Sequence, residues 1–332
     1  MKFIDMHCDT LMYAAEGMYS AEGGVSDLLK IPNAMLDVER MKKSGISTEF
    51  FAIFFPPKEN GFIVAKNKKY TDEEYFNLLY TCYKNTMELG KDHMAEAMNA
   101  ADIVKNEAAG KMSGILTFED GRIIDGSFEK MKHYYDLGLR LISLTWNEEN
   151  CFGHPNSDDL MLMSKGLTSF GKEAVEYMNE LGITIDVSHL SDGGFWDVAA
   201  ISKKPFIASH SNCRSLSPHR RNLTDEMIKK MAEAGGVSGV NFAPQFLNSD
   251  ITIKDSTVEL LSLHVRKMID LGGEDFPALG SDFDGTSGNL EVNCVSKMGL
   301  IFDRLKLDGV SERVIEKIAY DNAFRVIKET MK

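Results

Sequence analysis

Short apolar runs, rich in β-branched and aromatic residues, recur along the whole chain and are separated by segments with helical periodicity. Such runs predict buried strands, and the segments between them predict amphipathic crossover helices. The predicted strands cover residues 2–6, 47–55, 112–118, 139–145, 183–188, 205–209, 236–242 and 276–281. The clearest predicted helices cover residues 75–89, 128–136, 168–181, 224–234, 258–271 and 311–328.

Eight strands that alternate with helices are what a (β/α)8 TIM barrel requires, and insertions would account for the additional length. We therefore expect an α/β protein with a single catalytic domain over residues 1–332. The strand count alone leaves an open, doubly wound sheet as an alternative. In a barrel, catalytic groups project from the C-terminal ends of the strands, so the polar residues at those positions are the ones to examine.

Composition narrows the class of partner. The chain has 332 residues, with 37 Lys and Arg against 50 Asp and Glu, and a net charge of −13. We find no basic cluster suited to nucleic acid or an anionic membrane, so we expect small-molecule partners. The five cysteines form no CxxC pair, which argues against a disulfide framework and a thiolate zinc site. A strand pattern from the first residues and the lack of a transmembrane-length apolar run predict a cytoplasmic protein.

Side chains that can bind a metal follow several of the predicted strands. His7 and Asp9 follow the first strand, Glu119 the third, His189 the fifth and His210 the sixth. Because strand side chains alternate between faces, His7 and Asp9 should both face the barrel mouth. An imidazole and a carboxylate from one strand suit a zinc-like ion.

The number of these ligands favours two metal ions over one. An isolated His-x-Asp pair is more often structural, but two consecutive strands ending in Ser-His place two imidazoles side by side, where unpaired burial is costly. Five ligands exceed the need of one four-coordinate zinc, so we expect two divalent ions, with zinc as the expected metal, that share Glu119. We expect no ligand among the remaining histidines, which are His93, His133, His154, His219 and His264.

Asp282 and Asp284 place carboxylates after the last predicted strand. In a two-metal hydrolase a nearby carboxylate can carry a proton to the leaving group. Asp282 directly continues its predicted strand, so we assign it this catalytic role. Asp284 lies past the turn and is expected to cap the following segment.

A basic pair, Arg220 and Arg221, stands after the sixth predicted strand of an otherwise acidic chain. Two adjacent arginines in a loop are normally solvated. Here the loop leaves the expected barrel mouth, where a guanidinium can hold a carboxylate with two hydrogen bonds. The spacing therefore predicts that one of the two arginines anchors a substrate carboxylate.

Together these motifs resemble the membrane (renal) dipeptidase family of the amidohydrolase superfamily. The resemblance covers nearly the whole chain in the same order. The matching segments are residues 5–9, 118–121, 144–147, 185–189, 209–211, 220–222, 280–285 and 322–326. Each motif is short, but their order and their placement at strand ends make the set specific.

The resemblance implies a zinc-dependent dipeptidase in which a metal-bridging hydroxide attacks the peptide carbonyl. Its first ion would be bound by His7, Asp9 and Glu119, and its second by Glu119, His189 and His210. The family also commonly accepts a D-residue at the C-terminal side of the dipeptide.

The resemblance assigns substrate contacts as well. Arg221 would hold the substrate carboxylate, and Asp282 would contact the amino group or relay the proton. Eukaryotic members have a His after the Leu-Thr of strand four, whereas this chain has Trp146. We therefore expect Trp146 and Asn147 to contact the substrate. The oxyanion would then be stabilised by the metals or by another donor such as Asn147.

Other functions remain open at this point. Another binuclear amidohydrolase could act on a lactone, a cyclic amide or a phosphotriester, although many of those bridge their metals with a carbamylated Lys on strand four, where this chain has Thr145, Trp146 and Asn147. A metal-binding pseudoenzyme would lack a ligand or the acid/base carboxylate, and none is missing. We expect small dipeptide substrates and no nucleic-acid or membrane partner. The sequence does not reveal the oligomeric state, and a homodimer is one candidate.

Overall fold

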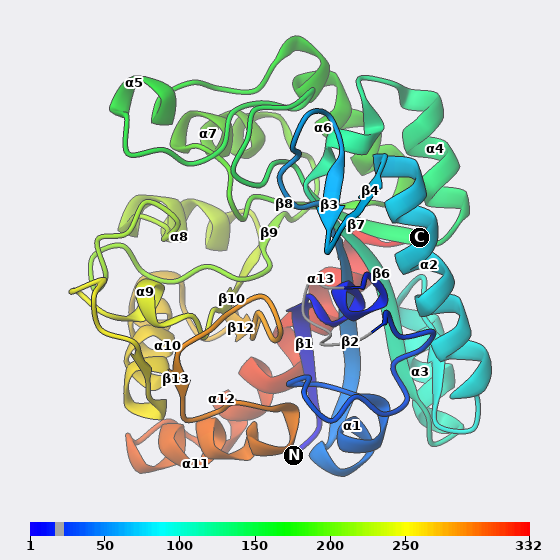
Figure 1. The fold of residues 1–332 in the computed structure, drawn as a ribbon. Coiled ribbons are helices and arrows are strands. Elements are labelled where there is room, and N and C mark those ends of the chain that lie inside the picture. The colour runs from blue at the N-terminus through cyan, green and yellow to red at the C-terminus, as the bar shows by residue number, and fades with distance from the viewer. Residues whose placement is uncertain (17–22) are drawn as a thin grey trace.

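Eight parallel strands form the centre of the computed structural model, which describes residues 1–16 and 23–332 (Figure 1). They run in the spatial order β1, β2, β6, β7, β8, β9, β10 and β12. Their bounds are β1 (Phe3–Cys8), β2 (Ile46–Phe54), β6 (Met112–Glu119), β7 (Leu139–Ser143), β8 (Thr184–Asp186), β9 (Ile207–Ala208), β10 (Val237–Val240) and β12 (Pro277–Leu279).

The backbone that follows β12 closes the sheet against β1. The Asp282 amide donates to the His7 carbonyl at 3.2 Å, and the Asp9 amide donates to the Phe283 carbonyl at 2.8 Å. Cys8 and Phe283 form a parallel bridge. The structure therefore confirms the predicted (β/α)8 barrel over the open sheet.

Helices lie around the outside of the strands (Figure 1). They are α1 (Val38–Ser44), α2 (Asp72–Leu89), α3 (Ala100–Ala108), α4 (Phe128–Asp136), α5 (Leu160–Met163), α6 (Ser169–Leu181), α7 (Asp192–Ile201), α8 (Asp225–Glu233), α9 (Pro244–Leu247), α10 (Val258–Gly272), α11 (Gly299–Leu307), α12 (Glu312–Glu316) and α13 (Asn322–Thr330). Short strands outside the barrel path are β3 (Ile63–Ala65), β4 (Lys68–Tyr70), β5 (Met94–Glu96), β11 (Asp255–Ser256) and β13 (Asn289–Leu290). No helix of the described residues is long and apolar enough to span a membrane.

Alternation along the strands divides the core in two. A larger cluster joins one set of strand residues, such as Phe51 and Phe118, to the surrounding helices. A smaller cluster joins the alternate set, such as Phe50 and Ile115, to Val326 of α13. The smaller cluster therefore fills the barrel, and α13 covers its end opposite the strand C-termini.

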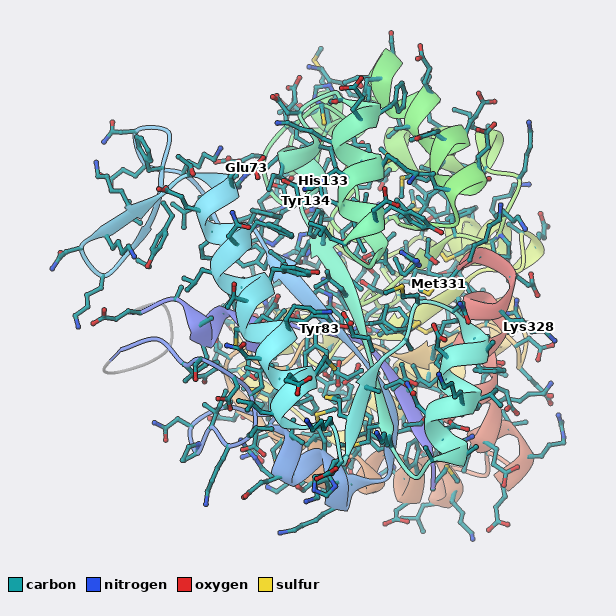
Figure 2. The ribbon with its side chains drawn as sticks, turned by 90° about the vertical axis from the view of Figure 1, so that its right-hand side faces the viewer. Glu73, Tyr83, His133, Tyr134, Lys328 and Met331 are labelled. Carbon is teal, nitrogen blue, oxygen red and sulfur yellow. The ribbon has the colours of Figure 1, made fainter. Side chains whose placement is uncertain are left out.

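Polar contacts tie the helical layer to the sheet on one side of the barrel. Tyr83 of α2 donates its hydroxyl to the Gly114 carbonyl at 2.9 Å, and Tyr134 of α4 donates to Glu73 at 3.0 Å. Figure 2 shows Tyr83 on the side of α2 that faces the sheet, Glu73 and Tyr134 where α2 and α4 approach each other, and Lys328 and Met331 near the C-terminal end of α13. Buried Tyr hydroxyls need such partners, so these contacts fix how α2 and α4 lie on the barrel.

Each of the eight predicted strands is present, but the strand ends differ from the predicted ones. The strand predicted at 205–209 is reduced to the two residues of β9. The helix predicted at 311–328 is divided into α12, a π-helical segment (Lys317–Asp321) and α13. A π segment of this kind inserts an extra residue into the turn, which apolar periodicity alone does not predict.

Candidate metal centre and substrate pocket

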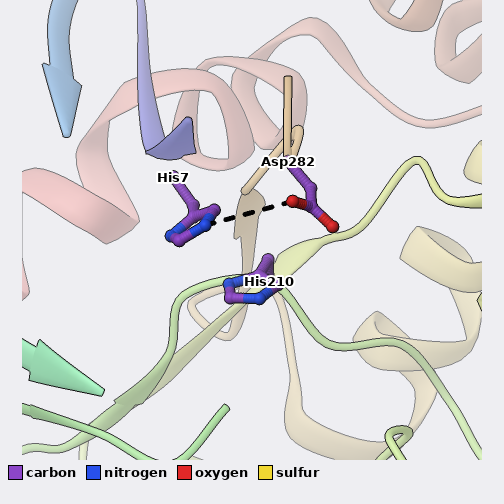
Figure 3. A group of neighbouring side chains, drawn as sticks. All are labelled: His7, His210 and Asp282. Carbon is purple, nitrogen blue, oxygen red and sulfur yellow. Dashed lines mark ion pairs between the residues drawn. The ribbon is translucent and has the colours of Figure 1, made fainter. Parts of the chain in front are cut away.

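The predicted metal ligands converge at the C-terminal ends of the strands. His7 lies in β1, Glu119 is the last residue of β6, and His189 and His210 follow β8 and β9. Figure 3 shows His7, His210 and Asp282 close together, with the ion pair between His7 and Asp282 as a dashed line. The rings of His7 and His210 stack with their centroids 3.9 Å apart. Residues distant in the sequence therefore form one cluster at the position where barrel enzymes carry their chemistry.

The two carboxylate oxygens of Glu119 face two different sets of side chains. Its Oε2 lies 3.6 Å from Nε2 of His7, which in turn lies 3.5 Å from Oδ2 of Asp9. Its Oε1 lies 2.9 Å from Nε2 of His189 and 3.4 Å from Nε2 of His210. Each set of three offers ligand atoms within 4.8 Å of one another. Glu119 is thus placed as a carboxylate between two ligand groups.

The polar atoms of this cluster are poorly satisfied by the protein itself. Nε2 of His7 and Oδ1 of Asp9 are buried and have no hydrogen-bond partner among the described residues. Nε2 of His189 and Nε2 of His210 face each other at 3.1 Å. Orphaned buried polar atoms are rare, and a divalent cation would satisfy all of them. Imidazole and carboxylate donors are those that zinc accepts.

Burial and mutual charge set the protonation of these groups. Burial raises the pKa of Asp9 well above its usual range, and the neighbouring Glu119 charge adds to this effect. Burial opposes the charged form of Glu119, but the charge of His7 and the hydrogen bond from His189 hold its pKa well below normal. Burial lowers the pKa of His189 to about 3 and that of His210 well below 6.5. These two imidazoles are therefore neutral, the form that binds metal.

Two of the predicted site residues have strained backbones. His189 has a φ of 68° and Asp282 a φ of 62°, in the left-handed region that non-glycine residues rarely adopt. Such conformations cost about 1–3 kcal/mol each and cluster at functional sites. Both lie where the chain turns after a strand, so the turn directs their side chains toward the cluster.

Asp282 and Asp284 take different positions, and the hydrogen bonds of Asp284 run to segments distant in the sequence rather than to the segment it was expected to cap. Oδ1 of Asp282 lies 4.0 Å from Nε2 of His7, and its Oδ2 accepts a hydrogen bond from Asn241 at 3.0 Å. Burial raises its pKa. Asp284 instead accepts hydrogen bonds from the Thr10 hydroxyl at 2.6 Å and the Met35 amide at 2.7 Å. Asp284 therefore joins loops, and only Asp282 faces the cluster.

A cavity of about 440 Å³ opens above the cluster. Its lining includes the basic side chains Arg220 and Arg221 and the aromatic side chains Phe54 and Trp146. The cavity therefore combines cationic and apolar groups with carboxylates and an imidazole of the cluster, as recognition of a small charged molecule requires.

The two arginines of the cavity lining differ. Arg221 is buried and donates to the Ser211 hydroxyl at 3.1 Å and the His210 carbonyl at 3.3 Å, while its Nε has no partner among the described residues. Arg220 forms an ion pair with the exposed Asp158. Burial lowers the pKa of Arg221 to about 10, so it remains a cation near neutral pH. Arg221 is thus the better placed of the two to hold an anion.

Trp146 and Asn147 both line the cavity. The Trp146 ring packs edge-on against Phe54, with centroids 4.9 Å apart, and lies 5.9 Å from the His189 ring. Asn147 is exposed, and its Oδ1 lies 3.3 Å from Nδ1 of His189. Trp146 therefore belongs to the apolar part of the lining, and Asn147 touches a predicted ligand.

The sequence did not reveal the residues that support the cluster from behind. Asn241 bonds Asp282, and Asp186 and Ser209 lie behind His210. A signal for Asp186 was present, since a carboxylate inside the apolar run 183–188 requires a partner. The partners themselves come from neighbouring strands, which only the barrel geometry brings together.

Comparison with known proteins agrees with this geometry. The family described as Membrane dipeptidase (Peptidase family M19) matches residues 1–332. A Klebsiella pneumoniae protein described as "Uncharacterized protein in pqqA 5'region" is 34% identical over 70% of the chain and 87% of its own length. Dipeptidase verJ of Clonostachys rogersoniana is 28% identical over 98% of the chain and 83% of its own length.

The fold has similar solved structures. A metallo peptidase from Rhodobacter sphaeroides, liganded with a phosphinate mimic of the dipeptide L-Ala-D-Ala, superposes with a TM-score of 0.83 and 26% identity. The similarity covers 99% of each chain. The barrel and its insertions are therefore shared over essentially the full length.

Proposed function

The chain belongs to the membrane dipeptidase family, peptidase family M19, and is a metallo-dipeptidase of that family. We propose that it cleaves dipeptides at the strand-end cluster with two zinc ions. The observation that carries this proposal is the position of Glu119, whose two oxygens face two separate ligand groups.

The ligand groups divide as follows. His7, Asp9 and Glu119 would hold one ion, and Glu119, His189 and His210 would hold the other. When bound, the ions supply a Lewis acid for the scissile carbonyl and lower the pKa of a water molecule. The orphaned nitrogen of His7 and the neutral state of His189 and His210 support this division.

The side chains of the cavity would orient the dipeptide. Arg221, which carries a buried guanidinium, would hold the C-terminal carboxylate. Asp282 would hold the free amino group or move the proton to the leaving nitrogen, because its carboxylate lies beside His7. Trp146, Phe54 and Asn147 would contact the remainder of the substrate. This arrangement suits a molecule as short as a dipeptide, because both of its charged ends have partners.

We also propose that the C-terminal residue can have the D configuration. Support comes from the Rhodobacter sphaeroides metallo peptidase, whose ligand mimics L-Ala-D-Ala. The same match favours a dipeptide over the lactone, cyclic amide or phosphotriester substrates of other binuclear barrels. The convergence of all five predicted ligands and Asp282 argues against a pseudoenzyme.

The test compares a dipeptide with the same dipeptide amidated at its C-terminus. We expect the amidated compound to be a much poorer substrate, because the buried Arg221 loses its anionic partner. Arg221→Ala should raise KM far more than Arg220→Ala, its matched control on the rim. Equal rates for the two compounds would refute the anchor assignment, and failure to cleave any dipeptide of either configuration would refute the proposed function.

A further inference from the structure

Behind the cluster lies a buried carboxylate that the proposed function does not use. Asp186 is the last residue of β8 and is fully buried. Its Oδ1 accepts the backbone amides of Ser188 and Ser209, each at 2.9 Å. Its Oδ2 accepts the hydroxyls of Ser143 at 2.5 Å and Ser209 at 2.6 Å. Four donors thus converge on this carboxylate, which satisfies a buried anion.

The hydroxyl of Ser209 has a second neighbour. Its Oγ lies 2.7 Å from Nδ1 of His210. A serine hydroxyl carries one hydrogen. Because that hydrogen goes to Asp186, Ser209 can only accept from the ring, so Nδ1 of His210 must carry the proton. The other nearby acceptor, Oγ of Ser188, lies farther away at 3.3 Å.

The position of this proton determines the protonation of the other ring nitrogen. A neutral imidazole with a proton on Nδ1 has its lone pair on Nε2. Nε2 of His210 is the atom that faces Oε1 of Glu119 and Nε2 of His189. The backbone amide of His210 donates to Oγ of Ser188 at 3.2 Å, which holds the residue in place. The lone pair therefore points into the cluster.

We propose that Asp186 and Ser209 are positioning residues that hold His210 as the Nδ1–H tautomer, with Nε2 free to bind a metal. The metal-binding role of this tautomer rests on the proposed function, whereas the tautomer itself is a property of the metal-free protein. Supporting partners of this kind typically account for about 10–100-fold in metal affinity.

Ser143 provides a matched control. Ser143 and Ser209 donate to the same oxygen of Asp186, and both are buried, but only Ser209 contacts His210. Ser209→Ala should weaken zinc affinity by about 10–100-fold in a chelator competition. Ser143→Ala should leave zinc affinity close to that of the wild type. Equal affinities of the two variants would overturn the proposal.

Asp186→Asn should reverse the direction of the hydrogen bonds that run between residue 186, Ser209 and the ring of His210. The amide oxygen must take the Oδ1 position, because two backbone amides donate there. The amide nitrogen then faces Ser209 and donates to it, which frees the serine hydrogen for Nδ1 of His210. The ring would become the Nε2–H tautomer, which cannot bind a metal through Nε2.

Nitrogen-15 NMR of the metal-free protein, with labelled histidine rings, reads this tautomer directly. His210→Gln identifies the His210 signals by their loss. We expect Nδ1–H in the wild type and Nε2–H in Asp186→Asn, whereas Nε2–H in the wild type would overturn the proposal even if a variant does not fold. Wild-type protein that binds no zinc would refute the metal centre but not the tautomer, so the two failures are distinguishable.

Discussion

Histidines occur in two very different buried settings in this molecule. His264 of α10 accepts the Cys213 amide at Nδ1, at 3.1 Å, and its Nε2 contacts the Leu247 carbonyl at 3.1 Å. Both of its ring nitrogens are therefore satisfied by backbone groups. In the strand-end cluster, Nε2 of His7 has no hydrogen-bond partner among the described residues, and those of His189 and His210 face each other.

This difference separates a structural histidine from one whose ring is available to bind a metal. The core histidine leaves nothing for a cation to bind, whereas the cluster presents lone pairs and carboxylate oxygens toward one point. Burial is nearly complete in both places, so burial does not distinguish them. What distinguishes them is whether the hydrogen-bonding capacity is used inside the protein.

The largest effect should come from Glu119→Gln, which removes the charge that both ligand groups share. An amide keeps the size of the side chain but bridges cations poorly, so both metal sites should lose occupancy. We expect the loss of kcat/KM to exceed the roughly hundredfold effect of removing a supporting residue. Metal analysis and dipeptide kinetics measure this result. Full occupancy of either site in this variant would contradict the bridging role, and His210→Ala, which should empty mainly one site, is the control.

A smaller effect is expected from Asp282→Asn. The amide preserves the size of the side chain but removes the base, so kcat should fall by at least about a hundredfold, the low end for general acid–base catalysis. Metal content should stay near that of the wild type. Asp284→Asn should instead lower the free energy of unfolding, because Asp284 accepts bonds from Thr10 and Met35. A nearly normal kcat for Asp282→Asn would move the proton-transfer role elsewhere.

The smallest effect on activity is expected for His264, whose contribution is confined to stability. Burial lowers the pKa of His264 to about 4, below the value of about 6.5 for an unfolded chain. Between these values the unfolded state binds a proton that the folded state does not, so stability falls as the pH falls. The neutral ring contributes fully above pH 6.5, and roughly 3 kcal/mol of that contribution should be lost by pH 4.

Denaturant unfolding of the wild type and His264→Gln at several pH values checks this contribution. The difference in unfolding free energy between the two proteins should shrink as the pH falls from 6.5 to 4. A constant difference over that interval would show that His264 does not titrate as its burial requires. Zinc affinity of His264→Gln should equal that of the wild type, in contrast to the cluster variants.

Much of the fold could be predicted because strands in a parallel barrel are buried on both faces and appear as apolar runs. Helices with weak signals escaped prediction. The segment of α7 contains Gly193 and Gly194, which lower helix propensity, but Ser191 caps it by accepting from the Gly194 amide. The hairpin of β3 and β4 was not predicted, because its strands are only three residues long.

The candidate ligands could be selected because each lies at the end of its predicted strand or within a few residues of it, as His7 and Glu119 show. The supporting residues could not, because their meaning depends on contacts between strands. Asp186 of β8 bonds Ser143 of β7 and Ser209 after β9, and Asn241 after β10 bonds Asp282 after β12. Lateral neighbours of this kind arise only when the strands pair side by side in the sheet.

In the proposed function, the strand-end cluster binds metal and hydrolyses dipeptides. The most direct test measures metal content and dipeptide hydrolysis on the same wild-type sample, before and after chelation and after zinc is restored. We predict about two divalent ions per chain, loss of activity when they are removed, and recovery with zinc. Full dipeptidase activity in protein shown to be free of metal would contradict the account.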